Sequence, residues 1–184
     1  MSDTVVFAFG RFQPPTIGHG MMFQLIKNHA AAENADHVIF VSKTQDKKRN
    51  PLDIDYKMTL LQTMFPNINF VACDDVIRTP VEAVKSLDGK YKNLVFMAGG
   101  DRINTLGPVI EKQNGIDYSF ASIELLSVGD RDPDSDGIDG VSGTCLREAA
   151  KIRDFKAFRR GIPSTLTDKD TETLMEMIST SIPC

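Results

Sequence analysis

Residues 5–19 read V-V-F-A-F-G-R-F-Q-P-P-T-I-G-H, a short apolar run that passes directly into a glycine and a rigid turn. The run Val5–Phe9 is continuous rather than alternating, which favours a strand buried on both faces, as in a parallel sheet. Pro14 and Pro15 prevent the strand from continuing, and Thr16 suits the N-cap of a following helix. The stretch therefore predicts a strand, a tight turn and a helix whose N-terminal amides can bind an anion.

The same alternation of apolar runs and helical patterns continues along the chain. Short runs rich in Val, Ile, Leu and Phe predict four further strands, the last from a weaker run, at Val38–Val41, Ile68–Ala72, Leu94–Ala98 and Tyr118–Ile123. Helical patterns occur at Met21–Ala32, Asp53–Phe65, Pro80–Leu87, Ile103–Lys112, Leu146–Phe158 and Asp168–Ile178. Strands that alternate with helices imply right-handed crossovers. We therefore expect an α/β fold: a Rossmann-like doubly wound parallel sheet of about five strands, in the order 3-2-1-4-5, with C-terminal helices.

We expect a single domain over residues 1–184, because no linker is long enough to separate two. Within it we expect an α/β core at 1–125, an acidic flap loop at 126–141 and the C-terminal helices at 142–184. The flap contains Asp132–Gly137, which resembles the start of a calcium-binding loop. The twelfth position from Asp132 is Gly143 rather than the glutamate that such loops need, so a flap is the preferred interpretation.

The composition narrows the class of protein. Hydrophobic residues make up 41% and charged residues 25%, as in folded soluble proteins. The balance of 21 basic and 25 acidic residues gives a net charge of −4, which argues against sequence-independent binding of nucleic acid. Cys73, Cys145 and Cys184 form no close pair, which argues against a disulfide framework and a zinc site. No signal peptide or run of membrane-spanning length is present, so we expect a cytoplasmic protein.

The turn after the first strand offers groups that suit a phosphate-bearing ligand. Gly10 lets the backbone approach a ligand closely. The open amides after Thr16, around Gly18, combine with the helix dipole to attract phosphate. His19 lies one turn into the helix and could donate a hydrogen bond to a phosphate oxygen as charge builds up in a transition state.

A second turn of this kind lies near the end of the chain, at Val141–Arg147. Ser142 or Thr144 can cap the helix that follows, and Gly143 leaves its amides open. Arg147 adds a guanidinium group on the first helical turn. Together these groups predict a second phosphate cradle.

The two turns resemble the signatures of the nucleotidyltransferase superfamily. The segment 16–19 resembles its first signature, H/T-x-G-H, and the segment 142–147 its second, S-x-T-x-x-R, in the same order along the chain. The longer string G-R-F-Q-P at 10–14 is similar to archaeal-type nicotinamide mononucleotide adenylyltransferases and related phage proteins, whereas Thr16 is more like phosphopantetheine adenylyltransferases. The resemblance implies catalytic roles for Thr16, His19 and Arg147. The nucleotide-binding residues that it implies are Gly10, Arg11, Phe12, Gly18, Ser142, Gly143 and Thr144.

Residues after the fourth predicted strand are candidates for the same site. Gly99, Asp101 and Arg102 follow that strand, which neighbours the first strand if the order is 3-2-1-4-5. The crevice between these strands is then the switch point at which ligands bind in such sheets. The family resemblance suggests contact with the ribose or the acceptor. The alternative is that Asp101 only caps the next helix.

A basic loop, Lys43–Leu52, follows the second predicted strand. Lys43 and Lys47 are candidates for neutralising a triphosphate or an acceptor phosphate, and Lys57 is a further candidate. The alternative is a solvated loop with no ligand.

The implied chemistry is in-line transfer at the α-phosphorus of a nucleoside triphosphate. The phosphate of the acceptor is already ionised near neutral pH, so positioning and charge stabilisation suffice without a protein nucleophile. We expect Mg²⁺ to enter with ATP, held by phosphates and water, and no metal site made by the protein alone. The expected partners are a nucleoside triphosphate and a small phosphate-bearing acceptor, with a homo-oligomer in keeping with the family. No nucleic acid or membrane is expected, and the location would be the host cytoplasm for a phage-encoded protein.

The resemblance favours transfer of AMP from ATP to nicotinamide mononucleotide, giving NAD and pyrophosphate. Thr16 departs from the pyridine-nucleotide pattern, and without tryptophan a pyridine ring stacks on Phe or Tyr, or not at all. Two alternatives therefore stay open. One is cytidylyl or adenylyl transfer to another phosphate acceptor. The other is a homologue that binds nucleotide without turnover, as a structural protein in a phage particle, for instance.

Overall fold

The computed structural model describes residues 2–129 and 141–182. Its sheet has five parallel strands in the order β3-β2-β1-β4-β5, which confirms the predicted fold and strand order. The strands are β1 (Thr4–Gly10), β2 (Asp36–Val41), β3 (Phe70–Ala72), β4 (Asn93–Ala98) and β5 (Ser122–Ser127). Most of the predicted acidic flap, at 130–140, lies outside the described residues.

The fifth strand was predicted too early. The weaker run at Tyr118–Ile123 contains large apolar residues, but Tyr118 and Phe120 are buried in the connection before β5 and pack into the core from there. β5 itself is an edge strand whose residues are only partly covered. An edge strand does not need the continuous apolar pattern of a central one, which is why the run misplaced it.

The helices are α1 (Ile17–Ala32), α2 (Ile54–Met64), α3 (Pro80–Leu87), α4 (Gly100–Gln113), α5 (Gly143–Lys151), α6 (Phe155–Arg160) and α7 (Asp168–Ser181). One predicted helix, Leu146–Phe158, is in fact two. Arg153 has a left-handed backbone with φ of 56°, which ends α5, and Asp154 then caps α6 by accepting from the amide of Ala157. An aspartate that caps a new helix is the signal that separates the two.

Contacts between residues divide the chain into two compact units. The sheet unit comprises Met1–Gly10, Met22–Ser42 and Ile68–Asp132, and the helical unit comprises Arg11–Met21, Lys43–Asn67 and Pro133–Cys184. A single domain over the whole chain stays a prediction. The helical unit is built from three separate stretches of sequence, so it collects the turn after β1, the basic loop and the second turn in one body.

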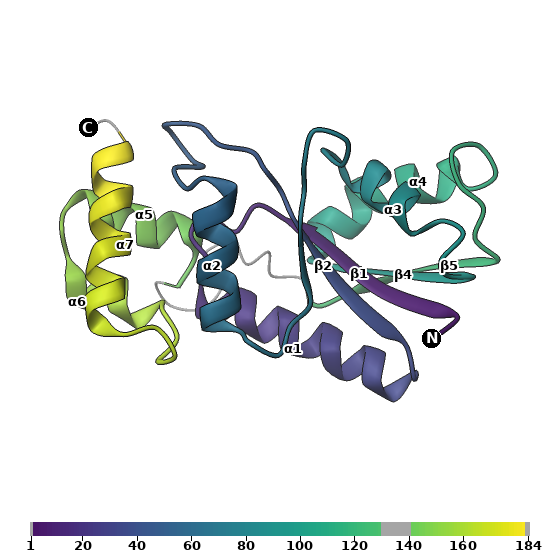
Figure 1. Cartoon of the computed structure of the whole chain (residues 1–184), viewed down its shortest axis with the longest axis horizontal. Coiled ribbons are helices and arrows are strands. Elements are labelled where there is room, and N and C mark those ends of the chain that lie inside the picture. The colour runs from purple at the N-terminus through teal and green to yellow at the C-terminus, as the bar shows by residue number, and fades with distance from the viewer. Residues whose placement is uncertain (1, 130–140, 183–184) are drawn as a thin grey trace. The chain divides into compact units, whose positions relative to one another are not determined.

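In the sheet unit, α3 and α4 cover one face of the sheet and α1 covers the other (Figure 1). Phe7 of β1 lies at the centre of the first face, with its ring stacked on that of Phe96 at 4.9 Å and edge-on to that of Phe40 at 6.4 Å. Toward the other face, Phe23 of α1 meets Phe70 of β3 edge-on at 5.1 Å. These layers fix the strand ends from which the connecting loops emerge.

In the helical unit, α2, α5, α6 and α7 share one apolar core (Figure 1). Its fully buried members include Leu146 of α5, Phe158 of α6 and Leu174 of α7.

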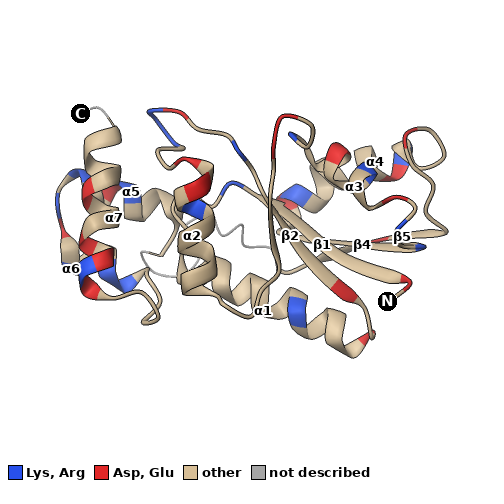
Figure 2. Cartoon of the chain, viewed as in Figure 1, with Lys and Arg blue, Asp and Glu red and all other residues tan. Residues whose placement is uncertain are grey.

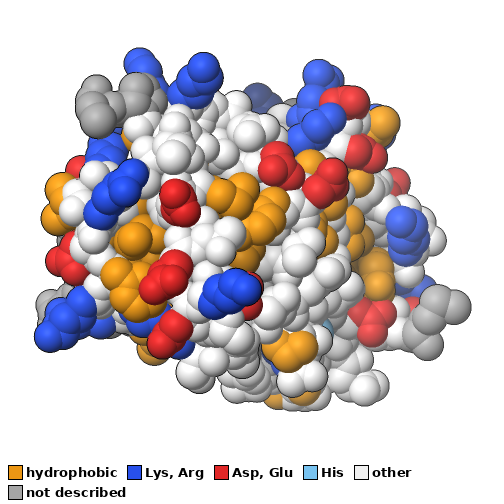
Figure 3. Space-filling model, turned by 60° about the vertical axis from the view of Figure 1, so that its left-hand side comes forward, with side chains coloured by type: hydrophobic (Ala, Val, Ile, Leu, Met, Phe, Trp, Pro, Cys, Tyr) orange, Lys and Arg blue, Asp and Glu red, His pale blue; other side chains and the backbone are white. Residues whose placement is uncertain are grey.

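None of the helices in the described part of the chain is both long and apolar enough to cross a membrane. On the face seen in Figure 3, hydrophobic side chains lie in several small groups among acidic and basic ones.

Candidate functional site

The turn between β1 and α1 ends in a capped helix N-terminus. Thr16 caps α1, because its hydroxyl accepts the N–H of His19 at 3.3 Å, as the sequence predicted. The N–H of Ile17 donates to the carbonyl of Gly161 at 2.9 Å. Among the described residues, the N–H of Gly18 has no protein acceptor. The sequence predicted several open amides in this turn. In the described structure, the amide of Gly18 is the one left open to an anion.

Hydrogen bonds fix the tautomer of His19. Its Nδ1 lies 3.1 Å from the backbone nitrogen of Thr16 and 3.0 Å from the Thr16 hydroxyl. A backbone N–H can only donate, so Nδ1 must accept, and the neutral ring then carries its proton on Nε2. The ring is nearly buried and meets the ring of Phe12 edge-on at 5.1 Å. His19 is thus held as a donor through Nε2.

The second turn also ends in a capped helix N-terminus, that of α5. Ser142, not Thr144, is the cap, since its hydroxyl accepts the N–H of Cys145 at 3.1 Å. Within the described residues, the N–H groups of Gly143 and Thr144 have no protein acceptor. A Cβ atom added to Gly143 would lie 3.3 Å from the carbonyl oxygen of Gln13, so the two turns are in close contact.

Two side chains join the three stretches of the helical unit. Arg147 donates through Nη1 to the carbonyl of Gln13 and through Nη2 to the Thr144 hydroxyl at 3.0 Å. The Gln13 side chain accepts the N–H of Leu52 at 2.9 Å and donates to the Leu52 carbonyl at 2.8 Å. The turn after β1 is therefore tied to both the second turn and the basic loop.

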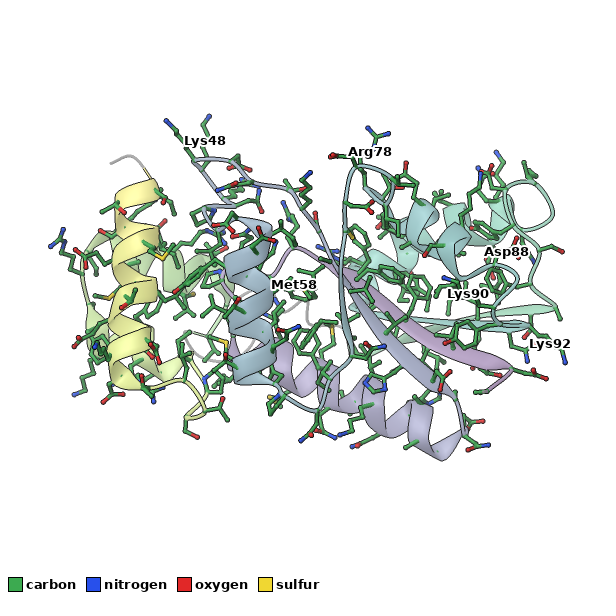
Figure 4. The ribbon with its side chains drawn as sticks, in the orientation of Figure 1. Lys48, Met58, Arg78, Asp88, Lys90 and Lys92 are labelled. Carbon is green, nitrogen blue, oxygen red and sulfur yellow. The ribbon has the colours of Figure 1, made fainter. Side chains whose placement is uncertain are left out.

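The basic loop is ordered around Asp46. Its carboxylate accepts the N–H groups of Arg49 at 2.7 Å and Lys48 at 2.8 Å, and it also bonds the side-chain amide of Asn50. The hydrogen bond from Arg49, followed by those from Asn50 and Lys48, holds the pKa of Asp46 well below its usual value. The loop is therefore a defined turn with a basic tip, which carries blue segments in Figure 2, and Figure 4 shows Lys48 at that tip.

These segments border one cavity of about 470 Å³ within the helical unit. Its lining contains five basic side chains and one acidic side chain, although the whole chain is mildly acidic. The acidic one, Glu148, is paired with Lys151 at 2.8 Å. The lining residues are Arg11, Gln13, Lys48, Arg49, Asn50, Thr144, Arg147, Glu148 and Lys151. A cavity with this charge suits a polyphosphate.

The predicted residues divide between the two units. Arg11, Thr144 and Arg147 line the cavity. The buried His19 and the partly exposed Gly18 are not part of its lining. The other predicted members of the helical unit are Phe12, Thr16, Lys43, Lys47, Ser142 and Gly143. Of these, Lys47 lines a second cavity, with Gln45, Asp46, Pro51, Thr180 and Ser181.

Gly10, Gly99, Asp101 and Arg102 belong to the sheet unit. Gly10 ends β1, and its carbonyl accepts the N–H of Ser42 at 2.8 Å. Arg102, in the first turn of α4 after β4, donates to the carbonyl of Phe9 in β1 at 3.2 Å, in keeping with the pairing of β1 and β4. Gly99 is the N-cap of α4 and Asp101 is exposed in its first turn, so Asp101 does not cap the helix.

Several lining residues were not predicted from the sequence. Lys48 and Arg49, rather than Lys43 and Lys47, are the basic-loop residues at the 470 Å³ cavity. Lys48 and Arg49 lie in the turn that Asp46 begins. An aspartate at the start of a turn can be recognised in the sequence, so this turn could have been predicted. Gln13 was quoted only as part of a motif. No sequence pattern points to Lys151 or Glu148.

Replacing Asp46 with asparagine tests whether the turn matters for binding. The folded-state pKa of Asp46 is lowered, so the stabilisation of the turn is fully present above pH ~4 and is lost as the pH falls through that lowered pKa. Near neutral pH, Asp46→Asn removes a negative charge from the loop that borders the cavity, which by itself would tighten binding of a polyphosphate. We expect the opposite, a several-fold weaker affinity for ATP by calorimetry, because Lys48 and Arg49 lose their common anchor.

The exposed residue Asp55 on α2 provides the matched control. Asp55→Asn makes the same change in net charge without touching the turn, and should leave the affinity unchanged or slightly higher. Tighter binding in both variants would show that only net charge matters.

Comparison with solved structures agrees with the fold. A solved structure of Plasmodium falciparum nicotinic acid mononucleotide adenylyltransferase, complexed with NaAD, has 15% sequence identity and a TM-score of 0.59. That alignment covers 95% of this chain and 98% of the Plasmodium chain, and a second structure of the same protein, complexed with APC, gives the same values. Thermotoga maritima TmcAL bound with alpha-thio ATP has 10% identity and a TM-score of 0.54, over 95% of this chain and 55% of that chain. At such identities the likeness shows the fold alone.

No curated protein sequence matches the chain. The sequence pattern of the cytidylyltransferase-like family, however, matches residues 7–149. That range includes both turns, the basic loop, residues 7–10 of β1 and all of the other four strands. Because it spans more than half of the 184 residues, the chain belongs to the cytidylyltransferase-like family of nucleotidyltransferases.

Proposed function

We propose that this nucleotidyltransferase transfers AMP from ATP to nicotinamide mononucleotide, forming NAD and releasing pyrophosphate. The observation that carries the proposal is the basic cavity, bordered by two turns that each leave at least one helix N-terminal amide open and are tied together by Arg147. A triphosphate has the charge and the oxygen acceptors that such a cavity requires.

In the proposed reaction, an oxygen of the acceptor phosphate attacks the α-phosphorus of ATP. The bond from the α-phosphorus to the oxygen that bridges to the β-phosphorus breaks, and pyrophosphate leaves with both electrons of that bond. Arg11, Arg49 and Arg147 would hold the triphosphate and stabilise the charge of the leaving group. His19 would donate through Nε2 to an oxygen whose charge increases in the transition state.

The donor set fits magnesium that arrives with ATP. The described residues contain no group of three or more His, Cys, Asp or Glu placed to hold a metal ion, and Glu148 is the one carboxylate of the cavity lining. The lining offers the Thr144 hydroxyl and the Glu148 carboxylate, and a bound triphosphate would supply its own oxygens. When bound, Mg²⁺ would neutralise part of the phosphate charge.

The choice of ATP and nicotinamide mononucleotide is supported by two motif strings. The string at 10–14 is similar to archaeal-type nicotinamide mononucleotide adenylyltransferases and related phage proteins, and the S-G-T string at 142–144 comes closest to the form found in pyridine-nucleotide enzymes. The fold is also shared with a nicotinic acid mononucleotide adenylyltransferase. The family match to cytidylyltransferase-like proteins favours CTP as the second candidate.

Pyrophosphate release in the presence of magnesium tests the proposal. ATP would be combined with nicotinamide mononucleotide, with nicotinic acid mononucleotide, with phosphopantetheine or with no acceptor, and CTP with a panel of alcohol phosphates. We expect rapid release only with ATP and nicotinamide mononucleotide, and NAD as the product. Release with another pair would reassign the substrates. Silence with every pair, in folded protein that binds ATP, would support the non-catalytic alternative.

Gly18→Ala is expected to separate binding from folding. A Cβ atom at Gly18 would meet only the Thr16 hydroxyl, at 3.5 Å, which is an ordinary contact. Alanine also favours a helix by up to about 1 kcal/mol over glycine, so stability should be unchanged or higher. The methyl group would obstruct the amide of Gly18, and losing a hydrogen bond to a charged phosphate weakens affinity for ATP by about 10- to 100-fold. Thermal unfolding and calorimetry on the same sample measure both. Unchanged affinity would show that this amide does not contact the nucleotide.

A further inference from the structure

Lys57 is a lysine with no exposed surface. It lies on α2 beside Met58, which Figure 4 labels, and its exposed fraction is 0%. Lysines are almost never fully buried unless their charge is compensated, because removing the ammonium group from water is costly. Its Nζ donates to the carbonyl oxygen of Arg11 at 2.7 Å. A buried cation therefore holds the backbone of the turn after β1.

The residue after Arg11 shows why that backbone needs to be held. Phe12 has a φ of 50°, a left-handed conformation that is uncommon for bulky side chains. Such conformations persist where the surroundings fix them, and they gather at functional sites. Lys57 donates to the carbonyl of Arg11, the residue before Phe12, and Arg147 donates to the carbonyl of Gln13, the residue after Phe12. Two basic side chains thus hold the backbone on both sides of Phe12, the residue of the turn with the left-handed conformation.

The side chains on both sides of the peptide group between Arg11 and Phe12 contribute to the site. The side chain of Arg11 lines the basic cavity, and the ring of Phe12 packs edge-on against His19. A rotation of the peptide group between Arg11 and Phe12 would move both. Lys57 itself does not line the cavity, in contrast to its expected role in neutralising phosphate.

We propose that Lys57 is a positioning residue: its buried ammonium group locks the turn at residues 11–13 so that Arg11 faces the nucleotide and Phe12 supports His19. The effect on catalysis rests on the proposed nucleotidyl transfer, whereas the effect on the turn does not.

The test compares Lys57→Met with Leu174→Ala. Methionine keeps most of the length but removes the charge and the donor, and Leu174 is a fully buried residue of α7 in the same helical unit, where truncation destabilises without touching the turn. At a temperature where both variants are folded, we expect Lys57→Met to lower kcat/KM by about 100-fold, mainly through kcat. Hydrogen exchange at residues 11–13 and 16–19 should be roughly ten-fold faster or more, and Leu174→Ala should show neither change.

A purely structural role for Lys57 predicts that the two variants behave alike once matched for stability, and that outcome overturns the proposal. Lys57→Gln keeps a donor in a smaller side chain and serves if the methionine variant does not fold; its exchange rates and kcat should lie between those of wild type and the methionine variant. In the wild type, nitrogen NMR should detect a slowly exchanging Lys57 ammonium group coupled to the Arg11 carbonyl carbon, and absence of the coupling also overturns the proposal.

Failure of the proposed reaction is recognised separately. Wild-type protein that releases no pyrophosphate with any substrate pair removes the catalytic readout but leaves the exchange and NMR readouts intact. Affinity for tripolyphosphate, which needs no turnover, then reports whether Arg11 is still aimed into the cavity, and it should fall in Lys57→Met but not in Leu174→Ala.

Discussion

Replacing His19 with alanine is expected to lower kcat for nucleotidyl transfer by about 10²–10³-fold, the usual effect of deleting one preorganised donor to a developing charge. His19 is held for this role from the Nδ1 side by two bonds from Thr16, at 3.1 Å and 3.0 Å. Those bonds leave the proton on Nε2 without reorganisation at the moment of reaction. Affinity for ATP should change much less than kcat, because the proposed bond from His19 strengthens only as charge develops in the transition state.

Two further variants sharpen that test. Glutamine places an amide N–H near the former Nε2 position, so His19→Gln should recover part of the lost rate. His29 lies on the same helix, away from the turn, and His29→Ala should keep wild-type kinetics. Wild-type kcat in His19→Ala would remove His19 from the mechanism, and a loss of ATP binding that matches the loss of rate would make it a ground-state binding residue instead.

The central strands could be located from the sequence because strands in the middle of a parallel sheet need apolar residues on both faces. β1, β2 and β4 carry such runs, and their positions were predicted within a few residues. The signal fails at the edge, where β5 is only partly covered and the larger residues Tyr118 and Phe120 are buried in the loop before it. An apolar run indicates buried residues, but buried residues also occur in loops, as Tyr118 and Phe120 show.

The glycines, hydroxyls and cations of the two turns were predicted because their order along the chain follows a family signature. Gln13 and Lys57 were not assigned their roles, since each acts through a backbone carbonyl or amide that is distant in sequence. Lys48 and Arg49 donate their backbone N–H groups to Asp46 and line the cavity, whereas Lys43 and Lys47 do not line it. Composition identifies a basic loop, but the direction of each side chain depends on contacts that form in the folded chain.

Arg147→Lys is expected to lower kcat/KM by about 100-fold even though it preserves the charge. The guanidinium group bonds two acceptors at once, the carbonyl of Gln13 and the hydroxyl of Thr144. Lysine presents a compact ammonium group on a flexible stem and lacks the planar fork that spans both. The turn after β1 would then separate from the second turn, and displacements near 1 Å are sufficient for a loss of this size.

Arg160→Lys provides the matched control for that substitution, because Arg160 is exposed at the end of α6 in the same unit. It should leave kcat/KM and stability unchanged. Raising the ATP concentration separates two explanations for Arg147→Lys: a defect only in binding disappears at saturation, whereas misplaced turns lower kcat itself. Recovery of wild-type kcat at saturating ATP would limit Arg147 to charge attraction, and the tie between the two turns would then be dispensable for the chemical step.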